Sequence, residues 1–175
     1  MPIQFHRLFA AICILVLSYL TSASADSSQP LVLEKFFQGK TIGKGVFESD
    51  IAGVRRPFTV YLTGTWSPAT SMFRLREDFV YEDGERDTKT WFFEKLSDGR
   101  YIGHRSDVIG QVLVLQGEDG ALRFSYIADV PRGDGSILLR FDDTLTQVDR
   151  RTVRNTARVL KAGILVGTVD LTFAR

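Results

Sequence analysis

Apolar and polar residues alternate along most of the chain after residue 40, and this period of two predicts β-strands. The clearest run is residues 57–66, in which one face carries Phe58, Val60, Leu62 and Trp66. Strict alternation is typical of strands with one buried face and one wetter face. The only helical signal is the segment 31–37 ("LVLEKFF"), which favours a single short turn. The pattern therefore predicts an all-β protein.

Turn signals separate the alternating segments. Asp-Gly occurs at residues 83–84, 98–99, 119–120 and 134–135, and this dipeptide tolerates the positive φ angles that tight hairpin turns require. We expect about ten strands, near residues 40–48, 54–65, 72–81, 88–96, 100–105, 111–116, 121–130, 136–148, 151–160 and 164–174.

Short connections between consecutive strands indicate an antiparallel up-and-down meander. An open sheet of this size would expose edges that invite aggregation, and closure into a barrel removes them. The sequence therefore predicts a lipocalin-like (calycin-type) β-barrel of about ten strands, with a two-sheet sandwich as the alternative. Barrels of this size either fill with side chains or hold one small ligand.

The first 25 residues have the pattern of a secretory signal peptide. A short segment ending in Arg7 precedes an uncharged run at residues 8–20, and Ala23-Ser24-Ala25 forms a small-x-small cleavage site. We expect residues 1–25 to be removed, residues 26–32 to form a polar tether and residues 33–175 to form one barrel domain. An uncleaved membrane anchor is the alternative. Cys13 lies inside the apolar run, so we expect a soluble periplasmic protein without a lipid anchor.

Composition excludes several classes of function. The chain has 22 Lys and Arg against 21 Asp and Glu, and loss of Arg7 with the signal leaves 21 of each. Zero net charge argues against general nucleic-acid binding, which depends on neutralising phosphates. Cys13 and His6 also leave with the signal, so His104 is the sole remaining histidine and Cys/His zinc sites are excluded. Nothing implies a cofactor, and no transmembrane segment follows the signal.

Two carboxylates fall on the apolar faces of predicted strands. Glu77 shares its face with Phe79 and Tyr81, and Asp143 shares its face with Phe141. A carboxylate inside an apolar wall is costly unless it is paired, and desolvation raises its pKa, so such groups are functional candidates. The alternative is a structural network with inward polar residues, or a position near the end of the barrel in water.

Two further segments supply weaker candidates. "GHRSDVIG" at residues 103–110 breaks the alternation, and its His104 and Asp107 are an acid/base pair in one interpretation and solvated loop residues in the other. Arg154 and Arg158 share one strand face, which is a solvated outer face unless an arginine reaches a carboxylate head group at the barrel end.

The order of several segments is similar to one known family. "LEKFFQGKTIGKGVFES", "RPFTVYLTGTW", "LREDFVYEDGERDTKTWFFEKLSDGRYIGHRSDVIGQ" and "RNTARVLKAGILVGTVDLTF" resemble the bacterial family known as domain of unknown function 3833. The resemblance covers about residues 33–173 and implies an uncharacterised envelope protein. Many members carry lipoprotein signals, whereas this chain has an Ala-x-Ala site. The resemblance implies no reaction.

The leading hypothesis is a periplasmic barrel that binds an apolar or amphipathic small molecule, such as a fatty-acyl compound. The candidate ligand-binding residues are Glu77, Asp143, Arg158, Tyr81, His104 and Asp107. One alternative is a small enzyme with Asp107, His104 or Glu77 as acid or base. Another is an envelope interaction protein without a pocket, suggested by the aromatic run "WFFEKL". A cavity of several hundred Å³ inside the barrel would favour the first hypothesis.

Overall fold

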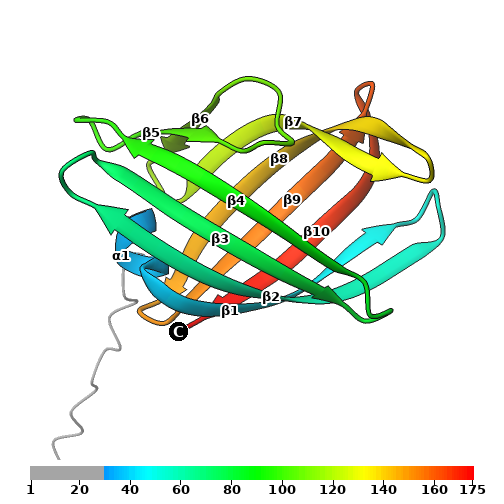
Figure 1. Ribbon diagram of the computed structural model, residues 1–175, viewed down its shortest axis with the longest axis horizontal. Coiled ribbons are helices and arrows are strands. Elements are labelled where there is room, and N and C mark those ends of the chain that lie inside the picture. Colours follow the sequence, from blue (N-terminus) through cyan, green and yellow to red (C-terminus); the bar gives the residue numbers. More distant parts are fainter. Residues whose placement is uncertain (1–29) are drawn as a thin grey trace, which may run out of the picture.

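The computed structural model describes residues 30–175, which form one closed barrel of ten antiparallel strands (Figure 1). The expected signal peptide, residues 1–25, and residues 26–29 of the expected tether lie outside the described residues. β1 pairs with β10, so that Ile42 lies opposite Ala174 and Glu48 opposite Thr168. This pairing leaves no free sheet edge, which confirms the predicted barrel and excludes the sandwich.

The elements follow the predicted pattern closely. A short helix, α1 (Leu33–Phe37), precedes the strands, as the segment 31–37 indicated. The strands are β1 (Gly39–Ser49), β2 (Val54–Ser67), β3 (Met72–Tyr81), β4 (Arg86–Lys95), β5 (Tyr101–His104), β6 (Val112–Gln116), β7 (Leu122–Arg132), β8 (Gly135–Asp149), β9 (Thr152–Lys161) and β10 (Ile164–Ala174). No helix in the described part of the chain is long and apolar enough to cross a membrane.

Three of the four Asp-Gly turns form as expected, and the fourth shifts by one residue. The glycines with positive φ in the first three are Gly84, Gly99 and Gly120. In the fourth, Arg132 pairs with Gly135, so the turn residues are Gly133 and Asp134. The positive φ of 57° therefore belongs to Gly133, because a two-residue hairpin turn needs its glycine between the paired positions.

The two ends of the barrel differ. At one end, which we call the helix end, α1 lies across the opening. At the other, the hairpin end, the β1–β2, β3–β4, β7–β8 and β9–β10 turns come together (Figure 1). Leu31 is also part of the core, with 1% of its surface exposed, and its N–H donates to the carbonyl of Gly120 at 3.0 Å. Leu31, which falls within the segment 26–32 that was expected to be a tether, therefore packs against the barrel.

Close packing and one polar network hold α1 against the barrel. Gly64 on β2 makes room for the helix, because a Cβ at this position would lie 2.0 Å from the carbonyl oxygen of Phe37. The hydroxyl of Tyr101 donates to Glu34 at 2.8 Å, and the ammonium of Lys95 pairs with the same carboxylate. Burial opposes ionisation of Glu34, but these two donors hold its pKa below the ordinary value.

Replacing Tyr101 with phenylalanine should lower the free energy of unfolding by about 1–3 kcal/mol, because the buried Glu34 carboxylate loses a hydrogen bond. Urea unfolding at pH 7 measures this change. Tyr61→Phe is the matched control, since Tyr61 lies half exposed on the outer face of β2 and should change stability little. Equal effects of the two substitutions would show that the Tyr101 hydroxyl does not anchor α1.

Candidate functional site

The barrel encloses a cavity of about 640 Å³. It extends from Leu33 and Phe37 at the helix end to Glu85, Arg86 and Pro131 at the hairpin end. This volume lies in the range of about 300–1,000 Å³ that is usual for small-molecule pockets. The cavity favours the ligand-binding hypothesis over a protein without a pocket.

Most of the cavity wall is apolar and aromatic. The aromatic side chains that line it include Phe58, Phe79, Tyr81, Trp91, Phe124, Tyr126 and Phe141. Several of these rings contact one another, and those of Tyr126 and Phe141 stack with centroids 5.2 Å apart. The alternation of each strand explains this wall, because the residues that it turns inward are mainly large and apolar.

A polar cluster interrupts this wall between the two ends. Its members, which all line the cavity, are Glu77, Lys89, Arg105, Asp107, Tyr126, Asp143 and Asn155. Glu77 lies on β3 between Leu75 and Phe79, and Asp143 lies on β8 between Phe141 and Leu145, so apolar residues flank both carboxylates along their strands.

Arg105 is the central cation of this cluster and is only 8% exposed. Its Nε and Nη2 atoms donate to the two carboxylate oxygens of Asp107 at 2.6 and 3.2 Å. The guanidinium also lies over the rings of Trp91 and Tyr126, at 4.6 and 5.2 Å from their centroids. These contacts fix the orientation of the guanidinium, because Asp107 accepts hydrogen bonds from two of its nitrogens and the two rings pack against its face.

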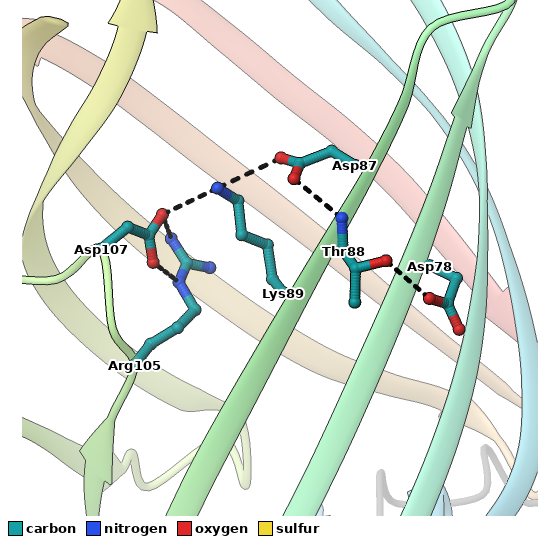
Figure 2. Close-up of polar contacts among 6 residues, drawn as sticks. All are labelled: Asp78, Asp87, Thr88, Lys89, Arg105 and Asp107. Carbon is teal, nitrogen blue, oxygen red and sulfur yellow. Dashed lines mark hydrogen bonds and ion pairs between the residues drawn. The ribbon is translucent and has the colours of Figure 1, made fainter.

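Lys89 continues the network from β4. Its Nζ lies 3.1 Å from a carboxylate oxygen of Asp107 and 3.1 Å from one of Asp87 (Figure 2). The two cations, Lys89 and Arg105, are therefore matched by two carboxylates, Asp87 and Asp107. Burial raises the pKa of Asp107, but Arg105 and Lys89 outweigh it and hold that pKa below the ordinary value.

Glu77 has no such partner. Its carboxylate makes no hydrogen bond or ion pair with any other residue between 30 and 175, although its side chain lines the cavity. Burial raises the pKa of Glu77 to about 7; the Arg105 charge opposes this rise and the Asp143 charge adds to it. Glu77 is thus an acid whose charge changes near neutral pH.

Asp143 is also incompletely satisfied, although it is only 6% exposed. Its Oδ1 accepts a hydrogen bond from Nδ2 of Asn155 at 2.7 Å. Its Oδ2 and the Oδ1 of Asn155 have no hydrogen-bond partner in the described part of the protein. Burial raises the pKa of Asp143 to about 6, against the opposing effects of Asn155, Arg105 and the hydroxyl of Tyr126. The cluster therefore contains unused hydrogen-bond acceptors.

The structure brings four of the six predicted site residues to the cavity: Glu77, Tyr81, Asp107 and Asp143. The other two, His104 and Arg158, are exposed and do not line it. Strand alternation explains why these two side chains point outward. Arg105, the neighbour of His104, points inward. Ala157 and Val159, on either side of Arg158, also point inward. Neither Arg158 nor His104 therefore lies where its side chain faces this cavity.

Four members of the polar cluster were not among the predicted site residues: Lys89, Arg105, Tyr126 and Asn155. A signal was present for each, because all four occupy the inward phase of the alternation. Arg105, for example, continues the inward series of Tyr101 and Gly103, which are both buried. The segment 103–110 breaks the alternation in the sequence, so Arg105 was not assigned to the inward face.

The aromatic run "WFFEKL", which suggested an interaction surface, divides between the two faces of β4. Trp91 faces the core and is 4% exposed, whereas its neighbour Phe92 is 41% exposed on the outer face. Among residues 30–175, no three His, Cys, Asp or Glu side chains form a group that could hold a metal ion.

Comparison with known proteins supports the fold and identifies the family. The structure is similar to the S-type phycobiliprotein lyase CPES from Guillardia theta, with a TM-score of 0.61 and 13% sequence identity over 83% of this chain and 93% of that chain. A candidate AttH protein from Nitrosomonas europaea, also 13% identical, aligns over 77% of this chain and 48% of that chain with a TM-score of 0.27. No curated protein matches the sequence. The model of the family of proteins of unknown function DUF3833 matches residues 13–175, so the chain belongs to that family.

Proposed function

We propose that this protein binds an apolar or amphipathic small molecule inside its barrel. The observation that carries the proposal is the cavity of about 640 Å³, whose aromatic wall surrounds the polar cluster. Pockets of this type bury the apolar part of a ligand and use a few polar groups to fix its orientation. The aromatic wall would hold the apolar part, and the polar cluster would hold the polar end.

The apolar part of the ligand is, in this proposal, a fatty-acyl or similar chain. A flexible chain suits a cavity that runs from α1 to the hairpin end between rings of several strands. The site of action is the periplasm, to which the signal-like residues 1–25 would direct the chain.

Native mass spectrometry of protein purified from its host should show a small molecule that dissociates from the folded chain on activation. Ala157 lines the cavity on β9, so Ala157→Phe should fill part of the space and weaken binding of the neutral apolar dye Nile red by about tenfold or more. Fluorescence titration measures this affinity.

Thr156→Phe is the matched control, because Thr156 is the neighbouring residue on the exposed face of β9. It adds the same ring outside the cavity and should leave the affinity for Nile red unchanged. A wild-type protein that carries no small molecule and does not bind Nile red would contradict the proposed function.

A further inference from the structure

The polar cluster has more negative charge and more hydrogen-bond acceptors than its own cations can satisfy. Lys89 and Arg105 are matched by Asp87 and Asp107 through the ion pairs described above. This leaves Glu77 without any partner and leaves Oδ2 of the buried Asp143 without a hydrogen bond in the described part of the chain. Both side chains line the same cavity. Both carboxylates therefore have unused acceptor oxygens at the cavity, to which a bound donor could be joined.

We propose that the polar end of the ligand is a protonated amine, which donates hydrogen bonds to Glu77 and is attracted by the second negative charge of Asp143. This inference rests on the proposed function and narrows its ligand to amphipathic amines. Charge-assisted hydrogen bonds from an ammonium to carboxylates are among the stronger polar contacts, and they gain strength where water is excluded. An ammonium group would satisfy acceptors that no residue in the described part of the protein satisfies.

A ligand carboxylate fits the same cluster poorly. Two nitrogens of Arg105 already bind Asp107, and Lys89 already pairs with Asp87 and Asp107. A carboxylate would have to compete with these residues for the cations and would also lie close to the unpaired Glu77. Like charges in a buried site repel each other strongly, so a free fatty acid should bind weakly whereas an amine with the same chain should bind well.

Binding should also be coupled to release of a proton. The charged groups that face Glu77 are Lys89 from β4, Arg105 and Asp107 from the segment after β5, and Asp143 from β8; its partner on β2 is the apolar Leu62. Without a ligand, burial favours the protonated form of Glu77 near neutral pH. An ammonium group favours the ionised form, so a bound amine should drive the proton off.

Isothermal titration calorimetry of the purified mature chain at pH 8 tests the inference with three probes of equal chain length: dodecylamine, dodecanol and dodecanoate. Dodecylamine and dodecanoate are used below their micelle-forming concentrations, and dodecanol below its solubility limit. Dodecylamine should bind at least about tenfold more tightly than dodecanoate. At pH 6.5, titrations in two buffers of different ionisation enthalpy should show net proton release with dodecylamine and none with dodecanol.

Glu77→Gln keeps the shape of the side chain and removes its charge. It should weaken dodecylamine binding by about tenfold, remove most of the proton release and change dodecanol binding much less than dodecylamine binding. Asp78→Asn is the matched control, because Asp78 is the next residue on β3 and pairs with Arg76 and Thr88 rather than with the polar cluster. It should leave the affinities for all three probes unchanged.

The outcomes separate this inference from the function on which it rests. Dodecanoate binding as tightly as dodecylamine, or unchanged amine affinity in Glu77→Gln, would overturn the amine inference while dodecanol binding still supports an apolar cavity. Failure of all three probes together with Nile red would overturn both proposals. The comparison of wild-type affinities requires no variant, so it decides the question even if Glu77→Gln folds poorly.

Discussion

Replacing Arg105 with methionine is expected to lower the free energy of unfolding by about 3–5 kcal/mol at pH 8, because it removes the central cation from a buried charged network. Asp107 would lose its two hydrogen bonds from the guanidinium, and only Lys89 would remain to balance the cluster. Methionine retains most of the apolar stem, so the loss reports mainly the charge. Chemical unfolding monitored by tryptophan fluorescence measures it.

The loss should be smaller in acid. The Arg105 charge lowers the pKa values of Glu77, Asp107 and Asp143, so its removal lets all three carboxyls take up protons at higher pH. Protonation removes the uncompensated charges, and the difference between Arg105→Met and wild type should therefore shrink as the pH falls from 8 to 5.

Arg76→Met on the outer face of β3 is the matched control. Arg76 pairs with Asp78 through exposed side chains, and an exposed ion pair of this kind contributes little to stability, so Arg76→Met should change the free energy of unfolding only slightly. If Arg105→Met destabilised the protein no more than Arg76→Met, the buried guanidinium would not be needed to hold the polar cluster.

Replacing Glu77 with glutamine is expected to raise the free energy of unfolding by about 2–3 kcal/mol at pH 8. The pKa of Glu77 is raised from 4.5 to about 7 in the folded protein, so the folded state binds more protons than the unfolded state between these values. Wild-type stability should therefore fall as the pH rises from about 4.5 to about 7, and then level off. Glutamine has no proton to lose, so its advantage should appear over the same range.

Urea unfolding of both proteins at pH 4.5, 6 and 8 measures this effect. Asp143 contributes in the same direction between its ordinary pKa of 3.8 and about 6, so part of the wild-type slope should persist in Glu77→Gln. Asp78→Asn should instead be less stable than wild type at pH 8, because Arg76 and Thr88 lower the pKa of Asp78 and so favour its ionised form in the folded protein. Equal stability of Glu77→Gln and wild type at pH 8 would mean that Glu77 carries no cost in the empty cavity.

The two substitutions are expected to change stability in opposite directions, although both residues belong to the polar cluster. Arg105 stabilises the empty barrel, whereas an ionised Glu77 destabilises it and has no compensating contact among the described residues. Residues that reduce stability persist where function requires them, which is why the unpaired carboxylate is the strongest sign of a ligand in this protein. Glu77→Gln should therefore be more stable than wild type and poorer at binding amines.

Most of the fold follows from local patterns in the sequence. Alternation of apolar and polar residues requires only the extended backbone, and it correctly placed the ten strands and turned Glu77 and Asp143 inward. Asp-Gly turns are equally local, and they located the hairpins to within one residue, with the shift to Gly133 as the exception. Short connections and the need to remove sheet edges then led to the closed barrel.

The composition of the polar cluster depended on tertiary structure. Alternation predicts that a residue points inward, but it does not predict which inward residues of distant strands lie at the same depth in the barrel. Arg105 follows the short strand β5, yet it meets Asp107, Trp91 and Tyr126 because barrel closure and register bring these segments together. Glu77 shows the same division. Its inward direction follows from the alternation of its own strand, but its lack of a hydrogen-bond or ion-pair partner depends on the positions of all the other strands.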